Sequence, residues 1–220
     1  MAGGEDLTAR ARIRDAALQQ FAAHGIKGTT IRGIAQAADV SPGLVQHHYG
    51  SKARLREACD EYAIETLRTT KLKGLEGGMG DPGFIMVAMR TAIPVQRYLA
   101  RALVDGSPAA ARLFDEAVAF SEEVLAEPTA GANKANTSDL RGYAAVLTTM
   151  SFSVLVLHEH LARSLGAEPL SIEGYPRMAK AMFDIFTDDL LSPELVAEAR
   201  AALDRLPGQP GHEDREGQER

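Results

Sequence analysis

Residues 29–52, TTIRGIAQAADVSPGLVQHHYGSK, decide the fold class of this chain. Thr30 suits a helix N-cap, because its hydroxyl oxygen can accept a hydrogen bond from a backbone N–H that the first turn leaves unpaired. The apolar residues after it recur at helical spacing: Ile31, Ile34, Ala35 and Ala38. Asp39 then stands where the chain must turn, and Asp tolerates the left-handed backbone that such a turn often needs. The segment therefore predicts a short helix followed by a tight turn.

A second short helix is predicted directly after this turn. Ser41 supplies another hydroxyl N-cap, and Pro42 suits the first helical position because its missing N–H would be unpaired there anyway. Val45 and Tyr49 are four residues apart, so they share one side of the helix and are expected to face the core. Two short helices joined in this way form a helix-turn-helix, whose second helix enters the major groove of DNA.

The opposite side of this second helix carries small and polar residues and no acid. Gly43 permits the close approach of a backbone, and Leu44 at the flank can contact a thymine methyl group. Gln46 and His47 can donate to base edges or accept from them. The alternative is a short surface helix of a purely structural bundle, in which this polar run would have no function.

Charge is distributed unevenly along the chain. Residues 1–56 contain eight Lys or Arg and four Asp or Glu, a net charge of +4, whereas the whole chain carries −6 and residues 57–220 therefore −10. Such an asymmetry is expected when one segment meets phosphate groups and the rest does not. Ser51 is a further N-cap, which places Lys52 in the first turn of the next helix. There its ammonium group and the unpaired N–H groups can share one phosphate.

Residues 10–56 resemble the N-terminal domain of the TetR family of bacterial transcriptional repressors. The residues that carry the resemblance agree in spacing and class through three helices: Ile13, Ala16, Ala17, Phe21, Gly25, Thr30, Ile34, Ala35, Ala38, Val40, Ser41, Gly43, Tyr49, Ser51, Lys52 and Leu55. The resemblance implies an all-α protein. It would have a three-helix DNA-binding domain, called the head below, and a helical body that binds a small effector and dimerises.

The resemblance also implies which head residues contact operator DNA. With Arg32 and Leu44 added, the expected contacts are Thr30, Arg32, Ser41, Gly43, Leu44, Gln46, His47, His48 and Lys52. Two positions depart from the family pattern, which often has Gly in place of Asp39 and Tyr in place of Gln46. The second departure leaves open whether Gln46 contacts a base or a phosphate. A dimer of such heads would bind a palindromic operator with half-site centres about 34–36 Å apart, or a multiple of that distance.

Prolines, glycines and N-caps divide the rest of the chain into predicted helices. Gly25 and Gly166 are each expected to end a helix in the left-handed conformation, and Pro94 is expected to separate two helices. The expected helices span residues 8–24, 52–73, 82–91, 94–104, 108–126, 138–165, 173–191 and 193–205. Loops are expected at residues 74–80 and 128–134, and a disordered tail from residue 207 onward.

The helix expected over residues 138–165 is apolar on nearly every side between Tyr143 and Leu157. Such a helix must be covered on every side, and one protomer's core covers only one face. The helix at 173–191 is also broadly apolar. We therefore expect a homodimer through the helices near 138–165 and 173–191, with Leu155 and Phe186 in the interface, as the resemblance also implies. A large monomeric core is the alternative.

An effector pocket inside the body is implied by the resemblance. Its candidate lining residues are Phe84, Met89, Ile93, Leu103, Phe114, Val118, Tyr143, Met150 and Phe152. Candidates for orienting a ligand are Arg90, Gln96, Arg97, Tyr98 and His158. This lining suits an apolar or amphipathic small molecule, although plain core packing is the alternative for each Met and aromatic residue.

Several function classes lack support in the sequence. There is no phosphate-binding loop, dinucleotide fingerprint or nucleophile elbow, so neither an enzyme nor a cofactor is expected. His158 and His160 are two residues apart on a predicted helix and point to opposite sides, so no metal site is expected. Cys59 is the single cysteine, which excludes an internal disulfide. The N-terminus has no apolar segment and no stretch suits a bilayer, so a cytoplasmic protein without membrane contact is expected.

These observations predict an all-α chain with a helix-turn-helix DNA-binding domain at 8–54, a helical effector-binding and dimerisation domain at 55–206 and a disordered tail at 207–220. The expected function is a ligand-responsive transcriptional regulator. It would be a repressor that binds a palindromic operator as a dimer and is released by a small apolar or amphipathic effector. The alternative is a helical protein-interaction module without sequence-specific DNA binding, whose docking should depend less on salt.

Overall fold

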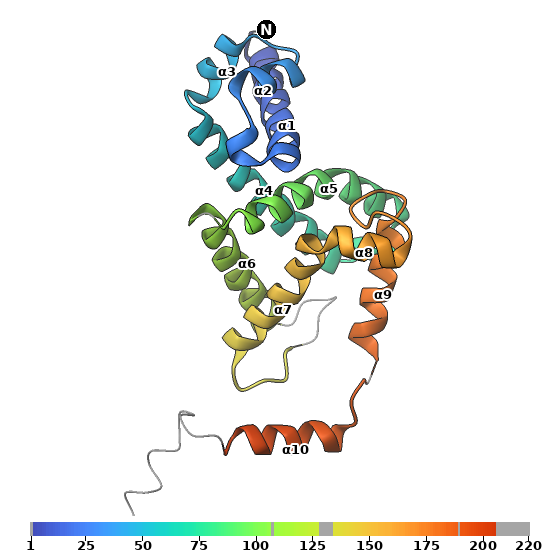
Figure 1. Ribbon diagram of the computed structural model, residues 1–220. Helices are drawn as coiled ribbons and strands as arrows, with labels where there is room; N and C mark the ends of the chain where they lie inside the picture. Colours follow the sequence, from blue (N-terminus) through green and yellow to red (C-terminus); the bar gives the residue numbers. More distant parts are fainter. Residues whose placement is uncertain (1, 107, 128–133, 189, 206–220) are drawn as a thin grey trace, which may run out of the picture. The chain divides into compact units, whose positions relative to one another are not determined.

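The computed structural model describes residues 2–106, 108–127, 134–188 and 190–205, and its regular elements in these ranges are all helical (Figure 1). This confirms the expected all-α fold. By contacts the chain forms two compact units, Met1–Pro176 and Arg177–Arg220. The expected domain boundary at residues 54 and 55 lies inside the first unit and stays a prediction. The head contains α1 (Ala2–Gly28), α2 (Ile31–Ala37) and α3 (Pro42–Tyr49).

The helix α4 (Lys52–Leu75) leads from the head into the body. The other elements of the first unit are the short 3-10 helix η1 (Gly78–Gly80), α5 (Pro82–Val104), α6 (Pro108–Ala126), α7 (Leu140–Val156) and α8 (His158–Leu165). The helix α9 (Tyr175–Thr187) begins at the end of the first unit, and α10 (Pro193–Leu203) belongs to the second unit.

Side-chain caps start each helix of the helix-turn-helix region as predicted. The hydroxyl of Thr30 accepts from the backbone N–H of Gly33 at 3.0 Å, and that of Ser41 accepts from Leu44 at 3.1 Å. The Ser51 hydroxyl caps α4 in the same way. Asp39 has a φ of 53°, which is the left-handed turn conformation expected for it. The short helices are therefore defined by contacts within a few residues.

The core of the head is continuous with that of the body, and one side of α3 is packed into it. Val45 is fully buried and Tyr49 is 8% exposed, as their spacing predicted. They join a cluster of buried side chains from α1, α2 and α4 that includes Ile13, Phe21 and Ile34. Because this side of α3 is packed, its other side is turned to solvent.

The C-terminal end of α1 differs from the prediction. Gly25 has the expected positive φ, 67°, but the chain resumes a helical path and α1 ends at Gly28. A Cβ at Gly25 would lie 3.0 Å from a guanidinium nitrogen of Arg101 on α5. The positive φ favours glycine here, and the missing Cβ also leaves room for the arginine side chain.

Two predicted helix boundaries in the body were wrong. Pro94 lies inside one continuous helix, α5, because buried residues on both sides of it, such as Ile93 and Val95, hold the helix in the core. Conversely, the long helix expected at 138–165 breaks at Leu157 into α7 and α8. Hydroxyl groups near the end of α7 bond back to carbonyls one turn earlier, as Ser151 does to Leu147, and such back-bonding often bends helices.

The remaining boundaries agree in part. Residues 78–80 form η1 within the loop expected at 74–80, and α9 is shorter than the expected 173–191. Gly166 has the predicted left-handed conformation after α8. Residues 128–133 of the expected loop and the expected tail at 207–220 lie outside the described residues. Among the described residues, no single helix is long and apolar enough to cross a membrane; α7 and α8 reach that length and hydropathy only as a pair bent by 69°.

A buried polar contact joins α4 to the body. The hydroxyl of Tyr98 on α5 donates to the carboxylate Oδ1 of Asp60 on α4, and both side chains are buried. Burial raises the pKa of Asp60 above its usual value, although Tyr98 and Arg56 oppose that shift. Since α4 carries the head, this contact fixes the helix that links head and body.

Candidate nucleic-acid interface

The outer side of α3 presents three exposed residues to solvent. They are Gly43, Gln46 and His47. A Cβ added at Gly43 would meet only the Ser41 hydroxyl, at 3.8 Å, so the fold itself does not need glycine there. The small residue instead leaves room for a partner to approach the helix backbone.

Leu44 and His48 lie at the two flanks of this surface rather than on it. Both are half-buried, and Leu44 packs against the core of the head. The fully exposed residues of α3 are therefore Pro42 at its start and Gly43, Gln46 and His47 after it. The structure does not test which of these residues contacts DNA.

Thr30, Ser41 and Arg32 are exposed beside α3. Each hydroxyl oxygen accepts a backbone N–H as a cap, which leaves the O–H hydrogen available to donate to a phosphate oxygen. The guanidinium of Arg32 is at the surface of α2. These groups can position a head on a DNA backbone without reading its sequence.

Lys52 has a structural role that the sequence did not reveal. Its ammonium nitrogen donates to the carbonyls of Ile26 and Thr29, both at 2.9 Å. The side chain therefore ties the start of α4 to the segment after the Gly25 kink. An ammonium has three N–H donors, so one remains for a phosphate.

Arg12 is a functional candidate that sequence reasoning missed. From α1, its guanidinium donates to the carbonyl of Ala38 at 2.8 Å and to that of Asp39 at 2.9 Å. These carbonyls lie at the end of α2 and in the turn before α3. Arg12 thus holds the turn that sets the angle between the two helices. No local signal could have shown this, because the partners are 26 and 27 residues away in the sequence.

Tyr49 fixes the other end of α3. Its hydroxyl donates to the carbonyl of Arg10 at 2.8 Å, and burial raises the pKa of the phenol despite the nearby Arg10 guanidinium. The hydroxyl therefore stays neutral and keeps its proton for this bond. Together, Arg12 and Tyr49 hold the turn before α3 and the C-terminal end of α3 against α1.

The positive charge of the head is only partly available to a partner. Arg14 pairs with Asp15 at 2.7 Å and stacks over the ring of Tyr62 at 3.5 Å, and Arg56 lies 3.8 Å from Asp60. Besides Arg12, which holds the turn, the exposed cations among residues 8–56 are Arg10, Lys27, Arg32 and Arg54. The interface can therefore contact phosphate groups through a subset of the basic residues.

The nine predicted pocket residues are not gathered around one cavity. Three are buried in the core, namely Met89, Ile93 and Val118. Tyr143 and Met150 are exposed at 45% and 52%. The other four are half-buried: Phe84, Leu103, Phe114 and Phe152.

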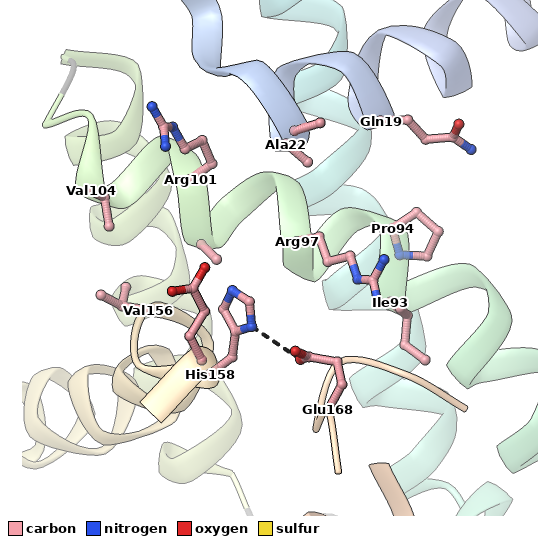
Figure 2. A pocket seen from close by; sticks show the side chains of 13 residues that line it. Gln19, Ala22, Ile93, Pro94, Arg97, Arg101, Val104, Val156, His158 and Glu168 are labelled. Carbon is pink, nitrogen blue, oxygen red and sulfur yellow. Dashed lines mark hydrogen bonds and ion pairs between the residues drawn. The ribbon is translucent and has the colours of Figure 1, made fainter. Parts of the chain in front are cut away.

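Two cavities are lined in part by the predicted residues. A cavity of about 240 Å³ between α4, α5, α6 and α7 is lined by Phe152 with Leu67 and Leu113. A larger one of about 880 Å³ is lined by Ile93, Arg97 and His158 (Figure 2). Among the residues proposed to orient a ligand, Tyr98 instead donates a hydrogen bond to Asp60, Arg90 is exposed and Gln96 is half-buried. No group of three or more His, Cys, Asp or Glu suited to a metal occurs in the part of the chain that the structure describes.

Comparisons with known proteins agree with this geometry. Residues 13–59 match the family described as bacterial regulatory proteins, tetR family, and residues 91–192 match the tetracyclin repressor-like C-terminal domain. The HTH-type transcriptional regulatory protein RaaS of Mycobacterium tuberculosis is 32% identical over 198 residues, which cover 88% of this chain and 92% of that protein.

Two further similarities are more limited. The HTH-type transcriptional regulator BetI of Burkholderia ambifaria is 38% identical over 73 residues, 33% of this chain and 38% of that protein. A crystal structure described as a TetR-family regulator from Rhodococcus sp. superimposes with a TM-score of 0.51 at 19% identity, covering 68% of this chain and 86% of that one, which shows a shared fold. The head geometry, both family matches and the nearly full-length relative lead to one conclusion: this chain belongs to the TetR family and is a helix-turn-helix transcriptional regulator.

Proposed function

We propose that this regulator is a dimeric repressor that binds a palindromic operator and releases it when a small apolar or amphipathic molecule binds the body. The observation that carries the proposal is the exposed side of α3, where Gly43, Gln46 and His47 project from a helix whose opposite side is locked in the core. A rigid, acid-free helix face of this kind suits the major groove.

The head contacts divide by chemistry into two groups. Gln46 and His47 read base edges, while Gly43 lets the helix backbone approach the DNA. The groups that hold the DNA backbone are Thr30, Arg32, Ser41 and Lys52. Leu44 and His48 contribute at the flanks, where their half-buried side chains border the exposed face.

The dimer forms through apolar side chains that the described chain leaves exposed. On α7 these are Tyr143, Val146 and Met150, with Val146 61% exposed; on α9 they include Phe183 and Phe186, 54% and 57% exposed. Large apolar residues at such density on neighbouring helical turns are typical of subunit interfaces. Leu155, which the sequence also placed in this interface, is 7% exposed and belongs to the core instead.

The effector acts through α4, the helix that joins head and body. The cavity of about 240 Å³ borders α4 at Leu67 and is mainly apolar, with Leu113 and Phe152 on its other walls. A ligand that prefers one position of α4 changes the distance between the two heads of a dimer and thereby its fit to the operator. The protein acts as a cytoplasmic regulator and performs no catalysis.

Selection of bound fragments from random duplex DNA tests this function. The expected site is twofold symmetric, with half-site centres about 34–36 Å apart or a multiple of that distance. Binding should weaken steeply between low and physiological salt because several phosphate contacts are made. A folded dimer that enriches no sequence, and whose binding responds little to salt, would instead be a protein-interaction module.

A further inference from the structure

The larger cavity lies between the head and the body, away from the apolar one. Its walls come from α1 of the head and from α5, α7 and α8 of the body, and its volume is about 880 Å³. Figure 2 shows Arg97 and Arg101 on one wall and His158 and Glu168 on the opposite one. The volume lies within the range of roughly 300–1,000 Å³ that small-molecule sites occupy.

Part of the wall is apolar and open to solvent. Val104 near the end of α5 is 63% exposed, and Val156 at the end of α7 is 37% exposed. Ala22 and Ala23 of α1 complete this apolar part. Exposed apolar groups within a concave surface are covered when a ligand with an apolar portion binds.

Two of the charged lining residues already have partners. The Arg101 guanidinium lies 3.3 Å from the carboxylate of Asp105. One carboxylate oxygen of Glu168 accepts from the backbone N–H of Leu170 at 2.9 Å and lies 3.1 Å from Nδ1 of His158. These contacts hold the side chains in place and partly satisfy their charges.

The other two charged residues are not paired in this way. Arg97 on α5 donates its Nε–H to the carbonyl of Leu170, at 3.0 Å. It forms no ion pair with an acid among the described residues. Glu159 on α8 is exposed and makes neither a hydrogen bond nor an ion pair within the described ranges. The cavity thus offers one unpaired cation and one unpaired anion, supplied by two different helices.

We propose that this cavity binds an amphipathic small molecule that carries both an acidic and a basic group. The acidic group pairs with Arg97, the basic group pairs with Glu159, and the apolar part covers Val104 and Val156. A purely apolar ligand would cover both charges without pairing them, and a ligand of single charge would leave one of them unmatched.

A ligand here touches the head and the body together. Arg101 of the cavity wall approaches the Gly25 kink of α1 so closely that a Cβ there would meet its guanidinium at 3.0 Å. The same kink segment receives the two hydrogen bonds of Lys52. Binding therefore favours one arrangement of α1 against α5. A regulatory consequence of that preference rests on the proposed function, whereas the binding itself does not.

Titration calorimetry on the full chain without DNA, at pH 7, tests the site with four matched probes. They are decanoate, decylamine, 2-aminodecanoate and 10-aminodecanoate, the last two being zwitterions with close and distant charges. We expect at least one zwitterion to bind about tenfold or more tightly than both singly charged probes. Since no DNA is present, failure of this experiment leaves the operator selection unaffected.

Three variants locate the binding. Glu159→Gln should lower the affinity for the better zwitterion to that for decanoate. Val104→Trp should occupy the apolar part of the cavity and abolish binding. Val87→Trp is the matched control, because Val87 is 65% exposed on the same helix outside the cavity and should leave binding unchanged. Equal or absent binding of all four probes overturns the proposal. So does a zwitterion preference that persists in Glu159→Gln, or zwitterion binding that persists in Val104→Trp.

Discussion

The outer side of α3 in the head and the exposed sides of α7 and α9 in the body are both helix faces open to solvent, but their chemistry is opposite. The first presents Gly43, Gln46 and His47, which are small or polar. The exposed sides of α7 and α9, each taken by itself, present large apolar side chains, such as Val146 on α7 and Phe186 on α9. A polar face loses little by staying in water, whereas an apolar face of this size gains free energy when another surface covers it.

The two faces are also held in different ways. The head face is fixed by hydrogen bonds with α1: Arg12 of α1 donates to the turn, and Tyr49 of α3 donates to the Arg10 carbonyl. The exposed side of α7 is held by packing of the opposite side of that helix, where Ala144, Thr148 and Leu155 are buried. A DNA-reading surface needs exact placement of few polar groups, while an apolar subunit interface tolerates small shifts and depends on area.

The largest expected effect is the loss of the dimer when a charge is placed on the exposed side of α9. Phe186→Glu should convert the dimer into a monomer, because it places a charge in an apolar interface. The operator affinity should fall about 100-fold or more when the second head is lost. Analytical ultracentrifugation and operator binding measure both. Val87→Glu is the control, because it places the same charge on another exposed apolar residue. Dimers that persist in Phe186→Glu would remove α9 from the interface.

In the head, Lys52→Ala should lower stability by about 1–3 kcal/mol, because two carbonyls lose their charged donor. Arg32→Ala should change stability by less than about 0.5 kcal/mol, since Arg32 is exposed. Each variant should reduce the salt dependence of operator binding by about one phosphate contact. Urea unfolding and salt titrations separate the two effects, and equal stability of both variants would contradict the structural role of Lys52.

Base reading should be lost without loss of stability. Gln46→Ala or His47→Ala should each reduce discrimination by about 1–3 kcal/mol at one position per half-site. Binding to a panel of singly substituted operators measures this loss of discrimination. The control is His24→Ala, since His24 is an exposed histidine outside α3, on α1. Unchanged discrimination in both variants would show that α3 meets DNA by a different side.

Gly43→Ala should change stability and operator affinity in opposite directions. Alanine is the better helix former, and nothing but the Ser41 hydroxyl lies near the added Cβ, so stability should rise by about 0.5–1 kcal/mol. Operator affinity should fall roughly tenfold because the methyl group keeps the helix away from the DNA. Tighter or equal operator binding would mean that the close approach at Gly43 does not occur.

The smallest effect concerns the link between the two regions. Burial raises the pKa of Asp60, so the folded protein takes up a proton there at a higher pH than the unfolded chain does. As the pH falls from 7 toward 4, wild type should therefore gain stability relative to Asp60→Asn. Thermal unfolding of both proteins across this range measures the difference. A difference that does not change with pH would show that Asp60 is not buried as a charge.

Local features made the head predictable. The three hydroxyl caps, the left-handed Asp39 and the spacing of Val45 and Tyr49 all act within four residues, so the sequence alone specified α2, α3 and the direction of their outer side. The same local rules were less successful in the body, where Pro94 did not end a helix and Leu155 proved to be core. Burial on both sides overrode the local preference there.

The sequence by itself therefore determined the fold class, the helix-turn-helix and the family, because capping and periodicity are short-range effects. Tertiary structure alone decided that Arg12 and Lys52 brace the head and that Tyr98 meets Asp60. It also decided that Arg97 and Glu159 line one cavity. These contacts join residues 26, 38 and 73 positions apart, in the bonds from Arg12 to Ala38, from Tyr98 to Asp60 and from Arg97 to Leu170. Such pairs depend on how whole helices pack, which no window of a few residues encodes.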